Sequence, residues 1–112
     1  MLPFATTRVV VKTPALEQWR GGVSADWSAA TSREVYATVE ALTPGQAKER
    51  HGIAVALREV MLPAGDPIAA TDRLSLDDGR DWEILHEPMP ITSPTGALSH
   101  VLVVCKRIGA GA

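Results

Sequence analysis

Residues 70–85, ATDRLSLDDGRDWEIL, carry four aspartates within ten positions, and the turn at their centre decides the fold. A three-residue turn at residues 77–79 places Leu74 opposite Trp82, whereas a two-residue turn would place Leu74 opposite Glu83. Only the longer turn places the apolar side chains of both strands on one face. With the shorter turn the register shifts by one residue, and the apolar side chains of one strand share a face with the polar side chains of the other. The shared face then consists of Leu74, Leu76, Trp82 and Ile84. The stretch therefore predicts a β-hairpin with one buried face.

The geometry of this turn accounts for its acidic residues, so no catalytic or metal-binding role is needed to explain them. Three-residue hairpin loops need a left-handed residue at the third position, which Gly79 supplies without steric cost. A calcium loop of the EF-hand type needs acids at alternate positions and a distal glutamate, but Asp77 and Asp78 are adjacent. Paired catalytic carboxylates need environments that separate their pKa values, whereas a hairpin tip exposes both to water. We expect neither metal binding nor catalysis here.

Patterns elsewhere in the chain indicate further strands and one helix. Residues 33–42, REVYATVEAL, alternate apolar and polar positions as a half-buried strand does. A short helix follows, in which Thr43 is a suitable N-cap and Gln46 completes a capping box. Pro44 suits the first turn and Gly52 the end. The other expected strands are residues 6–13, 53–62, 71–76, 80–87 and 99–108, the last apolar on both faces and therefore central.

Two connections are expected to be long loops. Residues 14–32 contain many small residues without clear periodicity, and a loop of this length is usually functional or mobile. Trp19 and Trp27 lie in this segment, and the simplest interpretation is that they fix the loop to the core. The second loop begins with the turn residues 63–67, PAGDP. The candidate interaction residues are Trp19, Trp27, Pro63, Gly65 and Asp66, and residues 109–112 are expected to form a flexible tail.

These elements predict a single mainly β domain over residues 1–112. A chain of 112 residues suits one domain. We expect five to six short strands with one short helix and long loops. Such elements bury their alternating apolar side chains by folding as a small β-barrel or sandwich.

Composition excludes several classes of protein. The chain is 46% hydrophobic and 21% charged, which is typical of a globular protein. A net charge of −2 gives no general attraction to nucleic acid. Cys105 is the single cysteine, so no intramolecular disulfide is expected. The N-terminus does not resemble a signal peptide, and no apolar run approaches the ~20 residues of a membrane span. We expect synthesis in the cytoplasm and no membrane contact.

Residues with reactive side chains are scattered. His51, His86 and His100 have no helical ligand spacing; His51 suits the helix C-terminus, and His86 is expected to pack at a strand end. Cys105 lies in the most apolar strand and is expected to be an inert core residue. We therefore predict no enzyme, no cofactor and no metal site. Two alternatives stay open: a barrel that binds a small molecule or peptide in a groove lined by Trp19, Trp27 and Trp82, and an enzyme that uses Cys105 with a histidine.

The order of these features resembles the head-to-tail stopper proteins (head-closure or head–tail connector proteins) of long-tailed bacteriophages, in particular those that infect actinobacteria. The resemblance covers most of the chain. It includes Asp26-Trp27, Thr43-Pro44, Leu62-Pro63-Ala64-Gly65-Asp66, Thr71-Asp72-Arg73-Leu74, Trp82-Glu83-Ile84, Ser93-Pro94-Thr95-Gly96, His100 and Lys106-Arg107-Ile108-Gly109. Trp82 stands where that family more often has tyrosine, and Met89-Pro90 where a tryptophan is common. The same order is also similar to head–tail adaptor and tail-completion proteins.

The resemblance implies a β-barrel subunit of the virion neck, made in the cytoplasm of the host bacterium. Subunits would form a ring, a dodecamer or hexamer, with the portal or adaptor above and the tail tube or terminator below. The ring would close the DNA-filled head and dock the tail, with no cofactor and no catalytic residue. Packaged DNA would be contacted only non-specifically, and a slightly acidic subunit suits such a channel because basic side chains would bind phosphates. A ring subunit needs lateral faces, and the two apolar faces of residues 99–108 fit this need.

Overall fold

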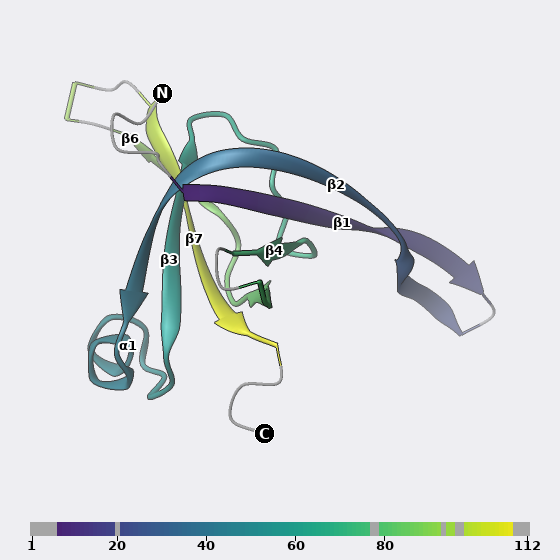
Figure 1. Cartoon of the computed structure of the whole chain (residues 1–112), viewed down its shortest axis with the longest axis horizontal. Helices are drawn as coiled ribbons and strands as arrows, with labels where there is room; N and C mark the ends of the chain where they lie inside the picture. The colour runs from purple at the N-terminus through teal and green to yellow at the C-terminus, as the bar shows by residue number, and fades with distance from the viewer. Residues whose placement is uncertain (1–6, 20, 77–78, 93, 96–97, 109–112) are drawn as a thin grey trace.

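The computed structural model describes residues 7–19, 21–76, 79–92, 94–95 and 98–108. Within them the chain forms one helix and seven strands (Figure 1). In chain order these are β1 (Thr7–Trp19), β2 (Gly22–Leu42), α1 (Pro44–His51), β3 (Leu57–Pro63), β4 (Arg73–Ser75), β5 (Asp81–Ile84), β6 (Met89–Thr92) and β7 (Leu98–Arg107). The protein is therefore mainly β, as predicted.

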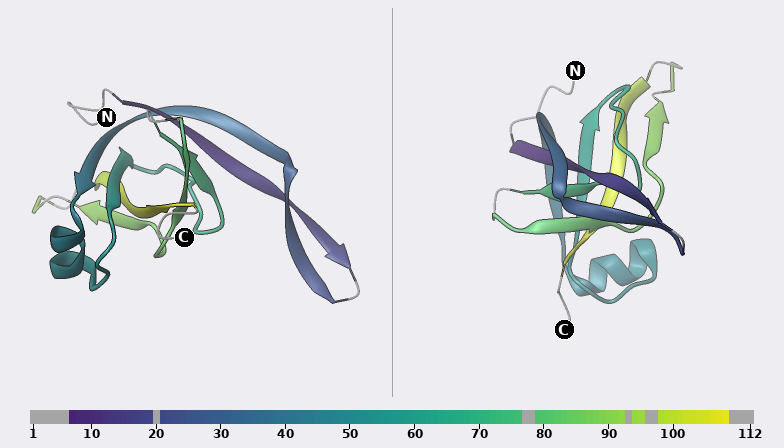
Figure 2. Two further views of the ribbon diagram at one scale, coloured as in Figure 1. Left: turned by 60° about the horizontal axis from the view of Figure 1, so that its bottom comes forward. Right: turned by 90° about the vertical axis from the view of Figure 1, so that its right-hand side faces the viewer.

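Six of these strands close into an antiparallel barrel. The sheet order is β3-β2-β1-β4-β5-β7-β6, and an additional pairing of β3 with β7 closes the ring of strands. β6 is the extra strand and pairs with β7 alone. Figure 2 shows the barrel from two further sides, with the ribbon of β1 and β2 running out of it. Of the two architectures expected, barrel or sandwich, the chain adopts the barrel.

Alternate residues of each strand fill the interior of the barrel. Val9 and Val11 of β1 face the same interior as Val60 of β3 and Val103 of β7. Completely burying one such aliphatic side chain contributes about 1.5–3 kcal/mol, so this set is the main source of stability. The core consists of Val9, Val11, Ala37, Val60, Leu62, Ile68, Leu74, Leu76, Trp82, Val101, Val103 and Cys105.

The β4–β5 hairpin has the predicted register. Leu74 pairs with Trp82, as the three-residue turn requires, and both side chains are buried. The N–H of Gly79 donates to the carbonyl of Leu76 at 3.0 Å, and φ of Gly79 is 74°, a left-handed value that favours glycine. Asp77 and Asp78 lie outside the described residues.

Helix α1 begins with the predicted capping box. The N–H of Gln46 donates to Oγ1 of Thr43 at 3.2 Å, and the N–H of Thr43 donates to Oε1 of Gln46 at 3.0 Å. The helix ends at Gly52. The next strand was expected to start at residue 53, but β3 starts at Leu57, because residues 53–56 connect the end of the helix to the sheet.

Helix α1 covers the outside of the barrel where β2, β3 and β7 run together. Ala47 of the helix packs with Leu42, Leu57 and Val104 in a second, smaller core. Val104 faces this cluster while its neighbours Val103 and Cys105 face the barrel interior. The prediction that the last strand is covered on both sides is confirmed, although its second apolar face is filled from within the chain.

The prediction of a long loop over residues 14–32 is wrong. Both β1 and β2 continue through this segment as a paired ribbon, with residues from Ala15 to Trp19 opposite those from Asp26 to Gly22. The ribbon leaves the barrel, so its strands bury no continuous apolar face. The alternation by which a strand is recognised is therefore missing from its sequence.

The strand β6 is an element that the sequence did not predict. Met89–Thr92 pairs with β7 despite Pro90, which is tolerated because β6 lies at the edge of the sheet. The predicted strands 71–76 and 80–87 shorten to β4 and β5. The expected tail, residues 109–112, lies outside the described residues. No helix in the described part of the chain is long and apolar enough to span a membrane.

Candidate interaction surface: the β1–β2 arm

The ribbon formed by residues 13–32, here called the arm, projects from the barrel (Figure 1). It gives the molecule extents of 48 × 30 × 24 Å and a radius of gyration of 14.8 Å. A compact domain of this length would have a radius of gyration of about 13 Å. The molecule is thus elongated, and the arm accounts for its length.

Each strand of the arm has a partner on one side only. β1 pairs with β4 only from Val10 to Lys12, and β2 pairs with β3 only from Thr38 to Leu42. Beyond those pairs the two strands have only each other among the described residues. An isolated two-stranded ribbon is marginally stable in water, and free strand edges are templates for pairing with another chain.

One face of the arm is apolar and exposed. Leu16 and Val23 have relative exposures of 67% and 58%. Leu16 pairs with Ala25, which lies two residues from Val23 on the same strand, so all three side chains share a face. A small exposed apolar surface on a projecting element is typical of a protein–protein contact.

The arm bends away from the barrel at a wide bulge in β2. Thr13 pairs with Thr31 and Ala15 with Asp26, so one residue of β1 stands opposite four of β2. The bulge is stabilised locally, since the N–H and Oγ of Ser28 donate to Oδ1 of Asp26 at 3.0 and 2.6 Å. Bulges of this kind increase the bend and twist of a strand.

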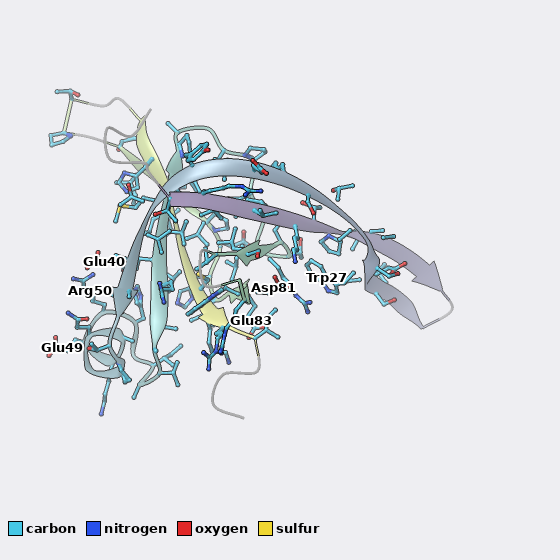
Figure 3. All side chains as sticks on the ribbon, in the orientation of Figure 1. Trp27, Glu40, Glu49, Arg50, Asp81 and Glu83 are labelled. Carbon is cyan, nitrogen blue, oxygen red and sulfur yellow. The ribbon has the colours of Figure 1, made fainter. Side chains whose placement is uncertain are left out.

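Two contacts fix the base of the arm to the barrel. On one side Trp27 stacks against β4, with the guanidinium carbon of Arg73 3.9 Å from the centre of its ring. Figure 3 shows Trp27 on the side of the arm that faces the barrel. This cation–π contact places the predicted interaction residue Trp27 at the bend. It ties its segment to the outer face of β4, whereas the expected contact was with the core.

The second contact is an ion pair between Arg33 of β2 and Asp66 of the β3–β4 connection. Nη1 of Arg33 donates to Oδ2 of Asp66 at 2.9 Å, Nη2 donates to Oδ1, and the Asp66 side chain is only 5% exposed. The hydrogen bond to Asp66 raises the pKa of Arg33, and the charges of Asp66 and Asp72 add to this rise against a lowering by partial burial. The ion pair with Asp66 therefore favours the charged form of Arg33.

The predicted interaction residues Pro63, Gly65 and Asp66 belong to this structural tie. The N–H of Asp66 donates to the carbonyl of Pro63 at 3.1 Å, and φ of Gly65 is 81°, so the four residues form a turn that requires glycine at its third position. Oδ1 of Asp66 also accepts from the N–H of Ile68 at 3.0 Å. The Asp66 carboxylate thus accepts hydrogen bonds from Arg33 and Ile68, and these bonds hold the β3–β4 connection in place.

The three tryptophans do not form the groove that one alternative required. Trp82 is 4% exposed and belongs to the core of the barrel. Trp27 lies at the bend of the arm, on Arg73. The backbone of Trp19 pairs with Gly22 at the tip of the arm, and its side chain lies outside what the structure describes.

The histidines and the cysteine occupy separate places. His51 ends α1, with Nε2 2.9 Å from Oε2 of the buried Glu59, and its ring centre lies 6.1 Å from that of His86. His86 was expected to pack at a strand end, but its side chain is exposed. Cys105 is wholly buried, as predicted. Across the described ranges, no three His, Cys, Asp or Glu residues come together in a way that could hold a metal ion.

A solved structure with the same fold is that of protein SF1141 from Shigella flexneri 2a. The alignment covers 99% of this chain and 100% of that protein, with a TM-score of 0.70 and 17% sequence identity. At this identity the similarity establishes the fold alone. No protein-family model matches the sequence, and no curated protein matches it.

Proposed function

We propose that this chain is a structural protein of the neck of a long-tailed bacteriophage, a head-to-tail stopper. Its subunits form a ring below the portal or adaptor, close the DNA-filled head and dock the tail. The proposal begins from the order of sequence features that resembles the stopper family. It is supported by the closed β-barrel, and no catalytic residue has a part in it.

The observation that carries the proposal is the arm. A projecting ribbon with unpaired edges and an exposed apolar face has little reason to persist in a chain that acts alone. It suits a subunit whose arm is buried when neighbours assemble. A ring of identical subunits needs such head-to-tail contacts, in which one part of a subunit meets a different part of the next.

Two further features of the structure favour a particular neck protein and a particular surface between subunits. A head–tail adaptor should be more helical, whereas the described residues contain a single helix of eight residues, which favours a stopper or a tail terminator. Val104 on the apolar outer face of β7 packs with Ala47 of α1, so this part of the face is not free for lateral contacts. The arm replaces β7 as the candidate surface between subunits.

The alternative of a ligand- or peptide-binding barrel has less support. The groove expected for it required Trp82, whose side chain is in the barrel core. Most of the buried residues that fill the barrel are aliphatic and pack on one another. This alternative predicts quenching of tryptophan fluorescence in a ligand screen, whereas a neck protein predicts none.

The position of the protein in virions tests the proposal directly. Antibodies against the chain, labelled with gold, should bind at the junction of head and tail in electron micrographs. Label confined to the capsid or to the tail tip, or virions without any copy of the chain, would contradict the proposal.

An armless variant tests the part assigned to the arm. Replacing residues 14–30 by Asn-Gly joins Thr13 to Thr31, which already pair across the ribbon, through a two-residue hairpin turn. The variant should keep the circular dichroism spectrum of a β protein and should fail to enter virions when it replaces the wild-type chain. The matched control is Met89→Ser, which changes an exposed apolar residue of β6 and should not affect incorporation. Normal incorporation of the armless variant would rule out the role of the arm.

A further inference from the structure

One end of the barrel carries two arginines on its inner face. Arg58 of β3 pairs with Cys105, and Arg107 of β7 pairs with Trp82. Residues paired across antiparallel strands point to the same side of the sheet, and both Cys105 and Trp82 belong to the barrel core. Arg58 and Arg107 therefore point toward the barrel axis from the end where β3 begins and β7 ends. Both side chains are half-buried.

The two arginines are neighbours on the sheet, and Arg58 contacts the aromatic ring of Trp82. The guanidinium carbon of Arg58 lies 5.1 Å from the centre of the Trp82 ring. Arg107 pairs directly with Trp82. It lies two residues beyond Cys105, the partner of Arg58, so the two arginines are diagonal neighbours on the sheet. Diagonal neighbours are separated by roughly 7–8 Å. Contact with the ring restrains the guanidinium group of Arg58.

Neither arginine has an acidic partner among the described residues. The ion pairs known among the described residues use other bases, namely Arg8, Lys12, Arg33, Arg50, His51 and Lys106. The acids of β5 nearest to Trp82 in sequence are engaged elsewhere: Asp81 accepts from Lys12 at 2.9 Å, and Glu83 lies 3.6 Å from Lys106. Asp81 and Glu83 flank Trp82 and therefore point to the outer face; Figure 3 labels both near the end of β7.

We infer that this end of the barrel is a binding site for a phosphate group, held between Arg58 and Arg107. Two guanidinium groups that face one space repel each other unless an anion lies between them. The planar fork of arginine matches the oxygen pairs of phosphate. A phosphate dianion balances both positive charges, whereas one carboxylate balances half of them. The site is independent of the proposed neck function, because it lies at the barrel end and not on the arm.

The phosphate has two possible sources, a free phosphate ion or the backbone of a nucleic acid, and the test separates them. Isothermal titration calorimetry of the full chain is performed with inorganic phosphate at pH 7.5, where the dianion predominates, and at constant ionic strength. A second titration uses a single-stranded dodecanucleotide, with and without phosphate as competitor. Binding of phosphate in the millimolar range, with displacement by the oligonucleotide, supports a nucleic-acid source. Binding of phosphate alone supports the free ion.

Two variants locate the site. Arg107→Gln lies at the end of β7 and should leave the fold intact while weakening phosphate binding at least tenfold. Arg58→Gln should weaken binding by as much, and Arg58→Lys should recover only part of it, because lysine keeps the charge and loses the fork. Circular dichroism and thermal melting identify any variant that fails to fold. If Arg58→Gln fails to fold, the phosphate affinity of Arg107→Gln alone tests the site.

The matched control is Arg73→Gln. Arg73 also stacks on a tryptophan, but it pairs directly with the acidic Glu83 and faces the outside of the barrel. Its replacement should leave phosphate binding unchanged. The proposal is overturned if the wild-type chain binds no phosphate, if Arg73→Gln weakens binding as much as Arg107→Gln does, or if a glutamate peptide binds and phosphate does not.

Discussion

The strands β1 and β2 run through both the barrel and the arm, but different interactions stabilise them in the two regions. In the barrel, β1 and β2 have further strands beside them and a core beneath them, and residues such as Val9 and Val11 are fully buried. In the arm the same strands have only each other, and Leu16 and Val23 are exposed. The barrel is thus held by burial of apolar surface, and the arm is held by the ribbon's own hydrogen bonds and by two contacts at its base.

The sharpest test of this contrast compares one leucine from each region. Leu74→Ala should lower the free energy of unfolding by about 3 kcal/mol, because the side chain is fully buried and its removal leaves a cavity. Leu16→Ala should change it by less than ~0.5 kcal/mol, since the side chain is 67% exposed. Urea unfolding followed by circular dichroism measures both. Equal losses would mean that the arm folds as part of the core.

The next largest effect is expected where the arm is tied to the barrel by charge. Arg33→Ala should cost about 2 kcal/mol, because it leaves the buried carboxylate of Asp66 without its partner. The cost stays below that of a fully buried ion pair, since the Arg33 side chain is 37% exposed. The control is Arg8→Ala, whose pair with Glu34 is more than half exposed on both sides and should contribute less than ~0.5 kcal/mol.

The same ion pair gives a prediction for pH. The pKa of Arg33 is raised in the folded protein, chiefly by its hydrogen bond to Asp66. A raised pKa gives a contribution that is fully present below the ordinary pKa of arginine and is lost only at higher pH. The destabilisation by Arg33→Ala should therefore be equal at pH 7 and pH 9. A loss that shrinks between these values would show that another group titrates with the pair.

The smallest effect is expected at the bend. Trp27→Ala removes the stacking on Arg73, which should contribute about 0.5–1 kcal/mol to the position of the arm. Backbone amides of residues 22–26 should then exchange with deuterium several times faster, while those of β3 and β7 should keep their rates. Faster exchange throughout the barrel would show that Trp27 supports the whole fold.

Sequence reasoning was most successful where burial imposes a pattern. The register of Leu74 and Trp82 followed from the need to keep apolar side chains on one face, and Gly79 fitted the left-handed turn position. The capping box of Thr43 and Gln46 identified the start of α1 from hydrogen-bonding chemistry alone. Each of these predictions used a physical constraint that acts over a few residues.

The arm and β6 were missed because no such constraint acts on them. Residues 15–19 and 22–26 pair along their backbones without filling a core, so small or polar side chains are acceptable there. The edge strand β6 contains Pro90, a residue that weakens the sequence pattern of a strand but is tolerated at the edge of a sheet. Arg58 and Arg107 were also missed, since only the closure of β3 onto β7 brings residues almost fifty positions apart in sequence to one barrel end.

Thr13 and Thr31 form the last regular pair before the bulge, so a change of length in the arm does not alter the strand pairing in the barrel. Residues inserted in equal number on both sides of the tip would lengthen the ribbon by about 3.4 Å for each added pair and leave every register of the barrel unchanged. Evolution or a protein engineer can therefore alter the reach of this molecule without altering its stability. Related proteins with the same barrel should differ most in the length of this one segment.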